Sequence, residues 1–141
     1  MTYSEIKKET EQKLENQKGI FYAFSKKDFE EGMKKIGLAP KDTNKIIDIG
    51  SGGFILKSEE KNFLDIFKVK KEKIKDLLNN EDEAKNAMLY ELINHEYGYT
   101  FDEEDAMAAL GLTLEEVANS ELLSRALKRA KEECLESESD M

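Results

Sequence analysis

A glycine-rich tetrapeptide, Gly50-Ser51-Gly52-Gly53, separates two short apolar runs at residues 45–49 and 54–57. Glycine readily adopts the positive φ angles of tight turns, so this pattern predicts a β-hairpin over residues 45–57. An aromatic run at residues 20–24 predicts one more strand. We therefore expect a small antiparallel sheet built from strand 20–24 and hairpin 45–57.

The rest of the sequence favours helices. It contains only two valines and a single proline, Pro40, so residues that favour strands or break helices are rare. Side chains that can cap a helix N-terminus occur at Thr2, Ser25, Ser58, Thr100 and Thr113. Apolar residues recur at helical spacing after these positions, with a first helix expected over 3–18 and a fourth over 81–97. The prediction is an α+β, mainly helical fold with about six helices.

The length of 141 residues suits one hydrophobic core, and we expect a single domain over residues 1–135. A last helical segment begins near Thr113 and is expected to kink at Asn119-Ser120. Its portion over 119–135 is a candidate extension, where Leu123, Leu127 and Ala130 form a seam suited to a homodimer. Residues 136–141 are predicted to be a frayed acidic tail.

Hydropathy and cysteine content exclude several classes. The longest apolar run, residues 20–24, is far shorter than the ~18 residues of a membrane helix. Residues 1–19 lack the apolar core of a signal peptide. The single cysteine, Cys134, cannot form a disulfide within the chain. We therefore expect a cytoplasmic protein that does not bind membranes.

Charge is distributed unevenly along the chain, whose net charge is −9. Residues 1–75 hold 17 lysines, no arginine and 13 acidic residues, whereas residues 76–141 hold five basic and 18 acidic residues. The acidic half is suited to attract a partner protein with a basic surface. Nucleic acid is not an expected partner, because phosphate binding requires clustered cations and the lysines of residues 68–75 spread around a helix.

The segment from Asp48 to Gly53 also looks like the first nucleotide-binding loop of S-adenosylmethionine-dependent methyltransferases. In such a loop, glycines let the backbone approach the cofactor at a helix N-terminus. Here a strand-like run follows the glycines, and no acidic residue ends a second strand about 20 residues later. A hairpin turn is the favoured interpretation, and no cofactor is predicted. A small enzyme or nucleotide binder that uses this loop is the alternative hypothesis.

The single histidine, His95, lies four residues after Glu91 and therefore on the same helical face. This pair supplies two metal ligands at most, so no metal site is predicted. A donor side chain near a helix C-terminus is stabilised by the last carbonyls, which makes a structural role the favoured interpretation. Cys134 has no evident base beside it, and no catalytic residue is assigned.

A partner-binding site is predicted over residues 94–105. Four consecutive carboxylates stand at the start of a predicted helix, where they stabilise its N-terminal dipole and can dock on a cationic protein surface. Aromatic and polar side chains precede them, as is common at interfaces. The predicted set is Asn94, His95, Tyr97, Tyr99, Asp102, Glu103, Glu104 and Asp105.

Three stretches of the sequence resemble an uncharacterised family of small proteins from phages and gut or Clostridium-like bacteria. They are FSKKDFEEG at 24–32, IGSGGFI at 49–55 and YELINHEYGYT at 90–100. The resemblance covers roughly residues 20–117, leaves the helix over 119–136 outside, and carries no assigned reaction. It implies a mobile-element setting, in which the protein regulates or inhibits a host protein. The expected partner with a basic surface is therefore a host or phage protein. Anti-defence or anti-CRISPR-like inhibition is one version of that expectation.

Overall fold

The structure, a computed structural model, describes residues 1–139. In this range the chain forms eight α-helices, two 3-10 helices and one three-stranded sheet. The helices are α1 (Tyr3–Glu15), α2 (Lys26–Lys35), α3 (Glu60–Leu77), α4 (Glu81–Asn94), α5 (Tyr97–Thr100), α6 (Glu104–Ala109), α7 (Leu114–Ala118) and α8 (Glu121–Ser139). The strands are β1 (Ile20–Tyr22), β2 (Ile46–Gly50) and β3 (Gly53–Leu56). The predicted α+β, mainly helical fold is confirmed, although the described residues contain more helices than expected.

The described residues fall into two compact units. The helical unit consists of Met1–Glu9 and the chain from Val69 onward, and the sheet unit is Thr10–Lys68. Both boundaries lie inside helices, one in α1 and the other in α3. The single domain expected over residues 1–135 stays a prediction.

The sheet unit is built on antiparallel strands in the order β1-β3-β2. Gly50, Ser51 and Gly52 take φ angles of 87°, 53° and 80° in the turn between β2 and β3. The predicted hairpin is therefore confirmed, and so is the prediction that glycines supply the positive φ angles of its turn. Strand β1 ends at Tyr22 instead of residue 24, because the chain turns there into α2. Ser25 caps that helix by accepting a hydrogen bond from the Asp28 amide (3.1 Å).

Aromatic packing forms the core of the sheet unit. The rings of Phe21, Phe29 and Phe54 contact one another with centroids 5.3–5.8 Å apart. Helix α2 lies on this cluster through Gly32, where a Cβ atom would come within 2.1 Å of the Phe21 ring. A side chain at Gly32 would therefore push α2 away from β1.

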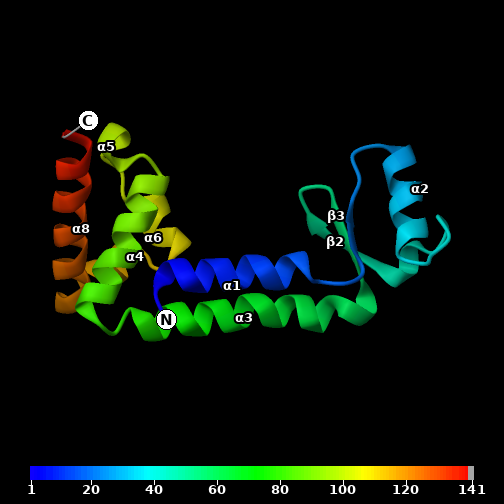
Figure 1. Cartoon of the computed structure of the whole chain (residues 1–141), viewed down its shortest axis with the longest axis horizontal. Helices are drawn as coiled ribbons and strands as arrows, with labels where there is room; N and C mark the ends of the chain where they lie inside the picture. Colours follow the sequence, from blue (N-terminus) through cyan, green and yellow to red (C-terminus); the bar gives the residue numbers. More distant parts are fainter. Residues whose placement is uncertain (140–141) are drawn as a thin grey trace. The chain divides into compact units, whose positions relative to one another are not determined.

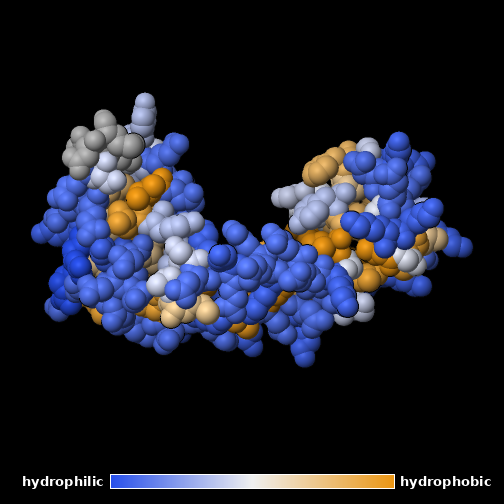
Figure 2. Space-filling model, viewed as in Figure 1, coloured by the Kyte–Doolittle hydropathy of each residue, from blue (hydrophilic) through white to orange (hydrophobic). Residues whose placement is uncertain are grey.

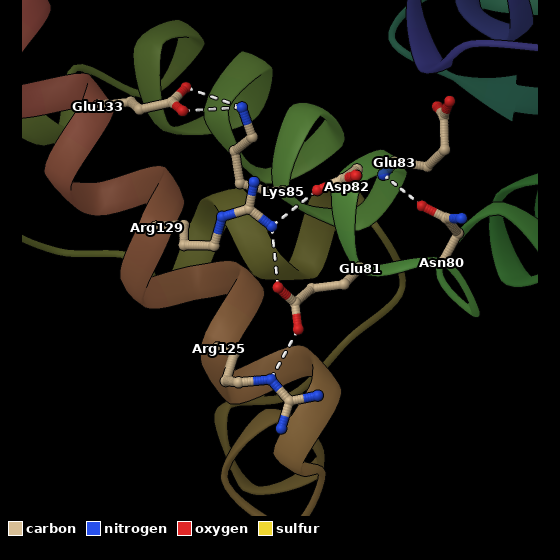
Figure 3. Close-up of polar contacts among 8 residues, drawn as sticks. All are labelled: Asn80, Glu81, Asp82, Glu83, Lys85, Arg125, Arg129 and Glu133. Atoms are coloured by element: carbon tan, nitrogen blue, oxygen red, sulfur yellow. Dashed lines mark hydrogen bonds and ion pairs between the residues drawn. The ribbon is translucent and has the colours of Figure 1, made fainter.

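In the helical unit, α4 and α8 lie side by side (Figure 1). Their contact buries completely Met88 and Leu92 of α4 and Ala126, Ala130 and Cys134 of α8. Charged side chains continue this contact toward the solvent (Figure 3). The pairs between the helices are Glu81–Arg125 (2.6 Å), Glu81–Arg129 (2.8 Å), Asp82–Arg129 (2.8 Å) and Lys85–Glu133 (2.9 Å). Exposed pairs of this kind add little stability each, and together they favour one alignment of the two helices.

The α8 residues expected to form a dimer seam lie in this core. Leu127 is buried, Ala130 is fully buried, and Leu123 is partly buried against the same cluster. These side chains are therefore in contact with the chain's own helices. A homodimer through α8 stays a prediction. Helix α8 continues to Ser139, where the sequence predicts a frayed tail over 136–141, and positions 140–141 lie outside the described residues.

Several helix boundaries differ from the predictions. Helix α1, expected over 3–18, ends at Glu15. The helix expected over 81–97 ends at Asn94, because Glu96 adopts a left-handed backbone conformation (φ 55°) and α5 follows as a separate turn. Ser58 does not cap α3, because it lies within a 3-10 helix, Lys57–Glu59. The break at Asn119-Ser120 is confirmed as the gap between α7 and α8. The capping box of Thr113 and Glu116 is confirmed at the start of α7.

No helix of residues 1–139 is both long and apolar enough to cross a membrane.

Candidate partner-binding site

The predicted site begins at the C-terminal end of α4, which is held by a buried carboxylate. Glu91 is only 1% exposed. Its Oε1 accepts hydrogen bonds from the Tyr3 hydroxyl (2.7 Å) and the Lys7 ammonium (3.1 Å). Its Oε2 accepts a longer one from the Asn94 amide (3.4 Å). A buried carboxylate needs such partners, and these contacts join α1 to α4 within the helical unit.

Aromatic rings surround this polar contact. The Tyr3 and Tyr90 rings meet edge to face, with centroids 5.3 Å apart. The Lys7 ammonium lies 5.1 Å from the Tyr90 ring and 5.7 Å from the Tyr3 ring. Lys7 thus combines an ion pair to Glu91 with cation–π contacts. We call Tyr3, Lys7, Tyr90, Glu91 and Asn94 the Glu91 cluster.

The Glu91 cluster shifts the pKa values of its acidic members in opposite directions. Burial raises the pKa of Glu91, but the hydrogen bonds from Tyr3 and Lys7 outweigh it, so the pKa lies below its ordinary value. Burial, followed by the hydrogen bond to Glu91, raises the pKa of Tyr3 well above its usual range. Glu91 is therefore held ionised and Tyr3 protonated, which is the arrangement that their hydrogen bond requires.

His95 closes the last turn of α4. It is the C-cap residue, and its Nδ1 lies 2.8 Å from the backbone oxygen of Glu91 and 3.5 Å from Oε2 of the same residue. The shared face of Glu91 and His95 agrees with their spacing in the sequence. Asn94 and His95 therefore both contact Glu91 and help to fix the end of α4.

Two left-handed residues bracket the single turn α5. Glu96 precedes it with φ 55°, and Phe101 follows it with φ 56°. Such conformations are uncommon for residues other than glycine and persist where surrounding contacts hold them. The outcome is a sharp difference between neighbouring aromatic residues: Tyr97 is 7% exposed, whereas Tyr99 is 89% exposed.

Contacts to α8 anchor this turn. The Tyr97 ring lies under the Lys131 ammonium, 5.8 Å from it, and its centroid is 6.0 Å from the Phe101 ring. The same ammonium forms an ion pair with Glu103 (2.9 Å). Tyr97 and Glu103 therefore position the segment, while Phe101 remains 64% exposed.

The remaining carboxylates lie at the surface. The side chain of Asp102 accepts a hydrogen bond from the Glu104 amide (2.9 Å), and the Asp102 amide donates to the Thr100 hydroxyl (3.1 Å). The prediction that Thr100 caps this helix is therefore wrong, because α6 begins at Glu104 with Glu103 as its N-cap residue. Within residues 1–139, Asp102, Glu104 and Asp105 form no ion pair.

The predicted residues thus have two kinds of position. Asn94, His95, Tyr97 and Glu103 contact neighbouring groups of the helical unit, whereas Tyr99, Asp102, Glu104 and Asp105 face the solvent. Two exposed apolar residues missed by the sequence analysis belong with the second set, Ile93 (50% exposed) and Phe101. Figure 2 shows hydrophobic atoms breaking the polar surface beside α4 and α5. The exposed set Ile93, Tyr99, Phe101, Asp102, Glu104 and Asp105 is called the 93–105 surface below.

The glycine loop, proposed as an alternative site, is covered by aromatic rings. A Cβ at Gly52 would come within 2.5 Å of the Phe24 ring, and one at Gly53 within 2.9 Å of the Tyr22 ring. Strand β3 follows this loop directly, where a nucleotide-binding loop leads into a helix. In this structure the glycines allow the turn and the close approach of the rings.

No group of three or more His, Cys, Asp or Glu side chains in the described part of the chain is placed to hold a metal ion.

Comparison with known proteins gives one match. No curated protein and no solved structure matches the chain. A family model matches residues 2–133. This range includes α1 and most of α8, so the expectation that the last helix lies outside the family is wrong. The chain belongs to the family described as a family of unknown function (DUF7659).

Proposed function

We propose that this protein is a protein-binding module that contacts its partner through the 93–105 surface. The observation that carries the proposal is the exposure of two large aromatic side chains, Tyr99 at 89% in the turn α5 and Phe101 at 64%, the left-handed residue that follows it. Aromatic residues are enriched in interfaces, where their burial supplies much of the binding energy. Holding them in water has a cost that binding would remove.

The charges of the surface indicate the chemistry of the partner. Asp102, Glu104 and Asp105 follow the exposed rings in the sequence, are exposed, and form no ion pair within residues 1–139. A partner with an apolar contact patch bordered by lysine or arginine would complement this arrangement. The excess of acidic residues over 76–141 would speed its association, and this effect weakens as salt increases.

In this proposal the protein acts by occupying or redirecting its partner, as a regulator or inhibitor. The resemblance to small phage and gut-bacterial proteins supports a host protein as the target, with anti-defence inhibition as one version. Binding through a surface of this kind requires no cofactor.

Charge reversal tests the proposal. In the test variant, Asp102, Glu104 and Asp105 are changed to Lys, while Glu103 is kept because it forms an ion pair with Lys131. The matched control changes Glu72, Asp76 and Glu132 to Lys; these are also exposed residues of the helical unit, and the change in net charge is the same. Each tagged protein is incubated with lysate of the organism that encodes it, and bound proteins are identified by mass spectrometry.

We expect the wild type and the control to retain the same protein and the test variant to lose it. A second pair separates apolar from ionic contact: Tyr99→Ser should also lose the partner, whereas Leu64→Ser, at another exposed apolar position (54%), should retain it. Equal retention by wild type and both test variants would show that the 93–105 surface does not bind the partner.

A further inference from the structure

A partly enclosed cavity of about 290 Å³ lies in the helical unit and shares no lining residue with the 93–105 surface. Its apolar wall consists of Leu78, which follows α3, and of Leu110 and Leu112, which flank Gly111 after α6. Leu78 and Leu110 are 8% and 4% exposed, so they belong to the core, and Leu112 packs against that core. The cavity therefore has a buried apolar wall and a volume near the lower size limit of ligand pockets, ~300 Å³.

Gly111 also lines this cavity. Its φ angle is 76°, which favours glycine, and a Cβ placed on it would meet no atom within 4 Å. The amide of Leu112 donates to the backbone oxygen of Met107 (2.9 Å), which fixes the turn after α6. The chain thus passes beside the cavity without a side chain at this position.

Two lysines of α3 line the same cavity. Lys71 and Lys75 are exposed and stand four residues apart, so they share one face of the helix. Neither has an ion pair or hydrogen bond from its ammonium group within residues 1–139. Like charges at this spacing destabilise a helix slightly. The chain contains 31 acidic residues, so carboxylates that could pair with these lysines are plentiful in the sequence.

The third charged group of the lining, Glu116, is engaged in the capping box of α7. Its Oε1 accepts hydrogen bonds from the Thr113 amide (3.2 Å) and the Thr113 hydroxyl (3.1 Å). Two ammonium groups and one carboxylate leave the lining with a single net positive charge. That charge matches a monoanion better than a phosphate ester, which carries about −1.5 to −2 at neutral pH.

We propose that this cavity binds a small apolar carboxylate, with its hydrocarbon body against Leu78, Leu110 and Leu112 and its carboxylate at Lys71 and Lys75. The apolar wall would remove the hydrocarbon from water, and the two ammonium groups would supply charge-assisted hydrogen bonds. The site is independent of the proposed partner-binding surface, because the two share no residue.

Calorimetry on the full chain tests this proposal. The probes are hexanoate and 3-phenylpropionate. Two further ligands serve as controls: 1-hexanol has the hydrocarbon chain of hexanoate without its charge, and acetate has the carboxylate without the long chain. The test variant carries Lys71→Gln and Lys75→Gln. The control carries Lys8→Gln and Lys128→Gln, two exposed lysines of the helical unit that lie outside this cavity.

We expect at least one of the two long carboxylates to bind the wild type and the control equally, and the test variant at least about tenfold more weakly. Hexanol and acetate should each bind more weakly than whichever of the two long carboxylates, hexanoate or 3-phenylpropionate, binds. Methyl NMR signals of Leu112 should shift on addition of that carboxylate. The proposal is overturned if neither carboxylate binds, if the test variant binds as well as the wild type, or if the Leu112 signals do not move. Circular dichroism confirms that both variants fold.

Discussion

The carboxylate of Glu91 and the exposed carboxylates of the 93–105 surface have opposite environments. Glu91 is 1% exposed and accepts hydrogen bonds from three side chains, whereas Asp102, Glu104 and Asp105 are exposed and form no ion pair in the described residues. Their aromatic neighbours differ in the same way: Tyr3 is 4% exposed and Tyr99 is 89% exposed.

The difference separates groups that stabilise the fold from groups that are available to a partner. The Glu91 cluster uses its hydrogen bonds, its cation and its rings within the chain, so removing a member should cost stability. The 93–105 surface contributes few internal contacts, so changes there should leave stability intact and affect binding. Each prediction below tests one side of this comparison.

The largest effect is expected from Glu91→Ala. This change leaves the hydroxyl of Tyr3 without its acceptor and Lys7 without its carboxylate. Breaking a buried ion pair typically costs about 3–5 kcal/mol, and we expect a loss in that range in urea unfolding. Asp105→Ala is the control, with a change within about 0.5 kcal/mol. Similar losses for both variants would contradict the assigned difference between these carboxylates.

The same carboxylate makes stability depend on acid pH. Because the pKa of Glu91 in the folded protein lies below its unfolded value, its contribution is present above the unfolded pKa. It is lost as the pH falls through the folded pKa. The difference in unfolding free energy between wild type and Glu91→Gln should therefore shrink on acidification below about pH 4.5. A constant difference down to pH 2 would show that folding does not lower the pKa of Glu91.

Removal of the Tyr3 hydroxyl should have a smaller effect. Tyr3→Phe keeps the ring contact with Tyr90 but removes a hydrogen bond to a charged group, which costs about 1.5–3 kcal/mol. The raised pKa of Tyr3 adds stability that is present below its unfolded pKa, near 10, and lost as the pH rises above it. Unfolding measured from pH 8 to 11 should therefore show a steeper decline for wild type than for the variant. Identical pH profiles would exclude this role.

The smallest change in stability is expected from Tyr99→Ser. The side chain is 89% exposed, so unfolding free energy should change by less than about 0.5 kcal/mol. Partner binding should weaken more than tenfold, since exposed aromatic anchors often dominate an interface. Urea unfolding and affinity for the captured partner are measured on the same preparation. A stability loss above 2 kcal/mol would place Tyr99 with the Glu91 cluster.

Local signals in the sequence predicted much of the fold. The glycine hairpin follows from the positive φ angles that Gly50 and Gly52 supply, and the caps at Ser25 and Thr113 act within three residues. These features depend on neighbouring residues only. The helix breaks are less predictable, because Glu96 and Phe101 adopt left-handed conformations that their residue types do not favour.

The candidate site could be predicted only in part, for a related reason. The acidic run and the nearby aromatic residues are visible in the sequence, but the opposite exposures of Tyr97 and Tyr99 depend on contacts with α8. The hydrogen bond from Tyr3 to Glu91 joins residues 88 positions apart. A carboxylate at helical spacing after Ala84 and Met88, on the buried face of α4, is the sequence signal that could have identified it.

A photocrosslinking experiment tests the central claim most directly. Tyr99 is replaced with p-benzoylphenylalanine, and the same substitution at Leu64 (54% exposed) provides the control. After irradiation in lysate of the encoding organism, we expect position 99 to form a covalent adduct with one defined protein, and the charge-reversed variant to form none. Crosslinking to that protein from position 64 but not from position 99 would contradict the assignment of the 93–105 surface as the binding site.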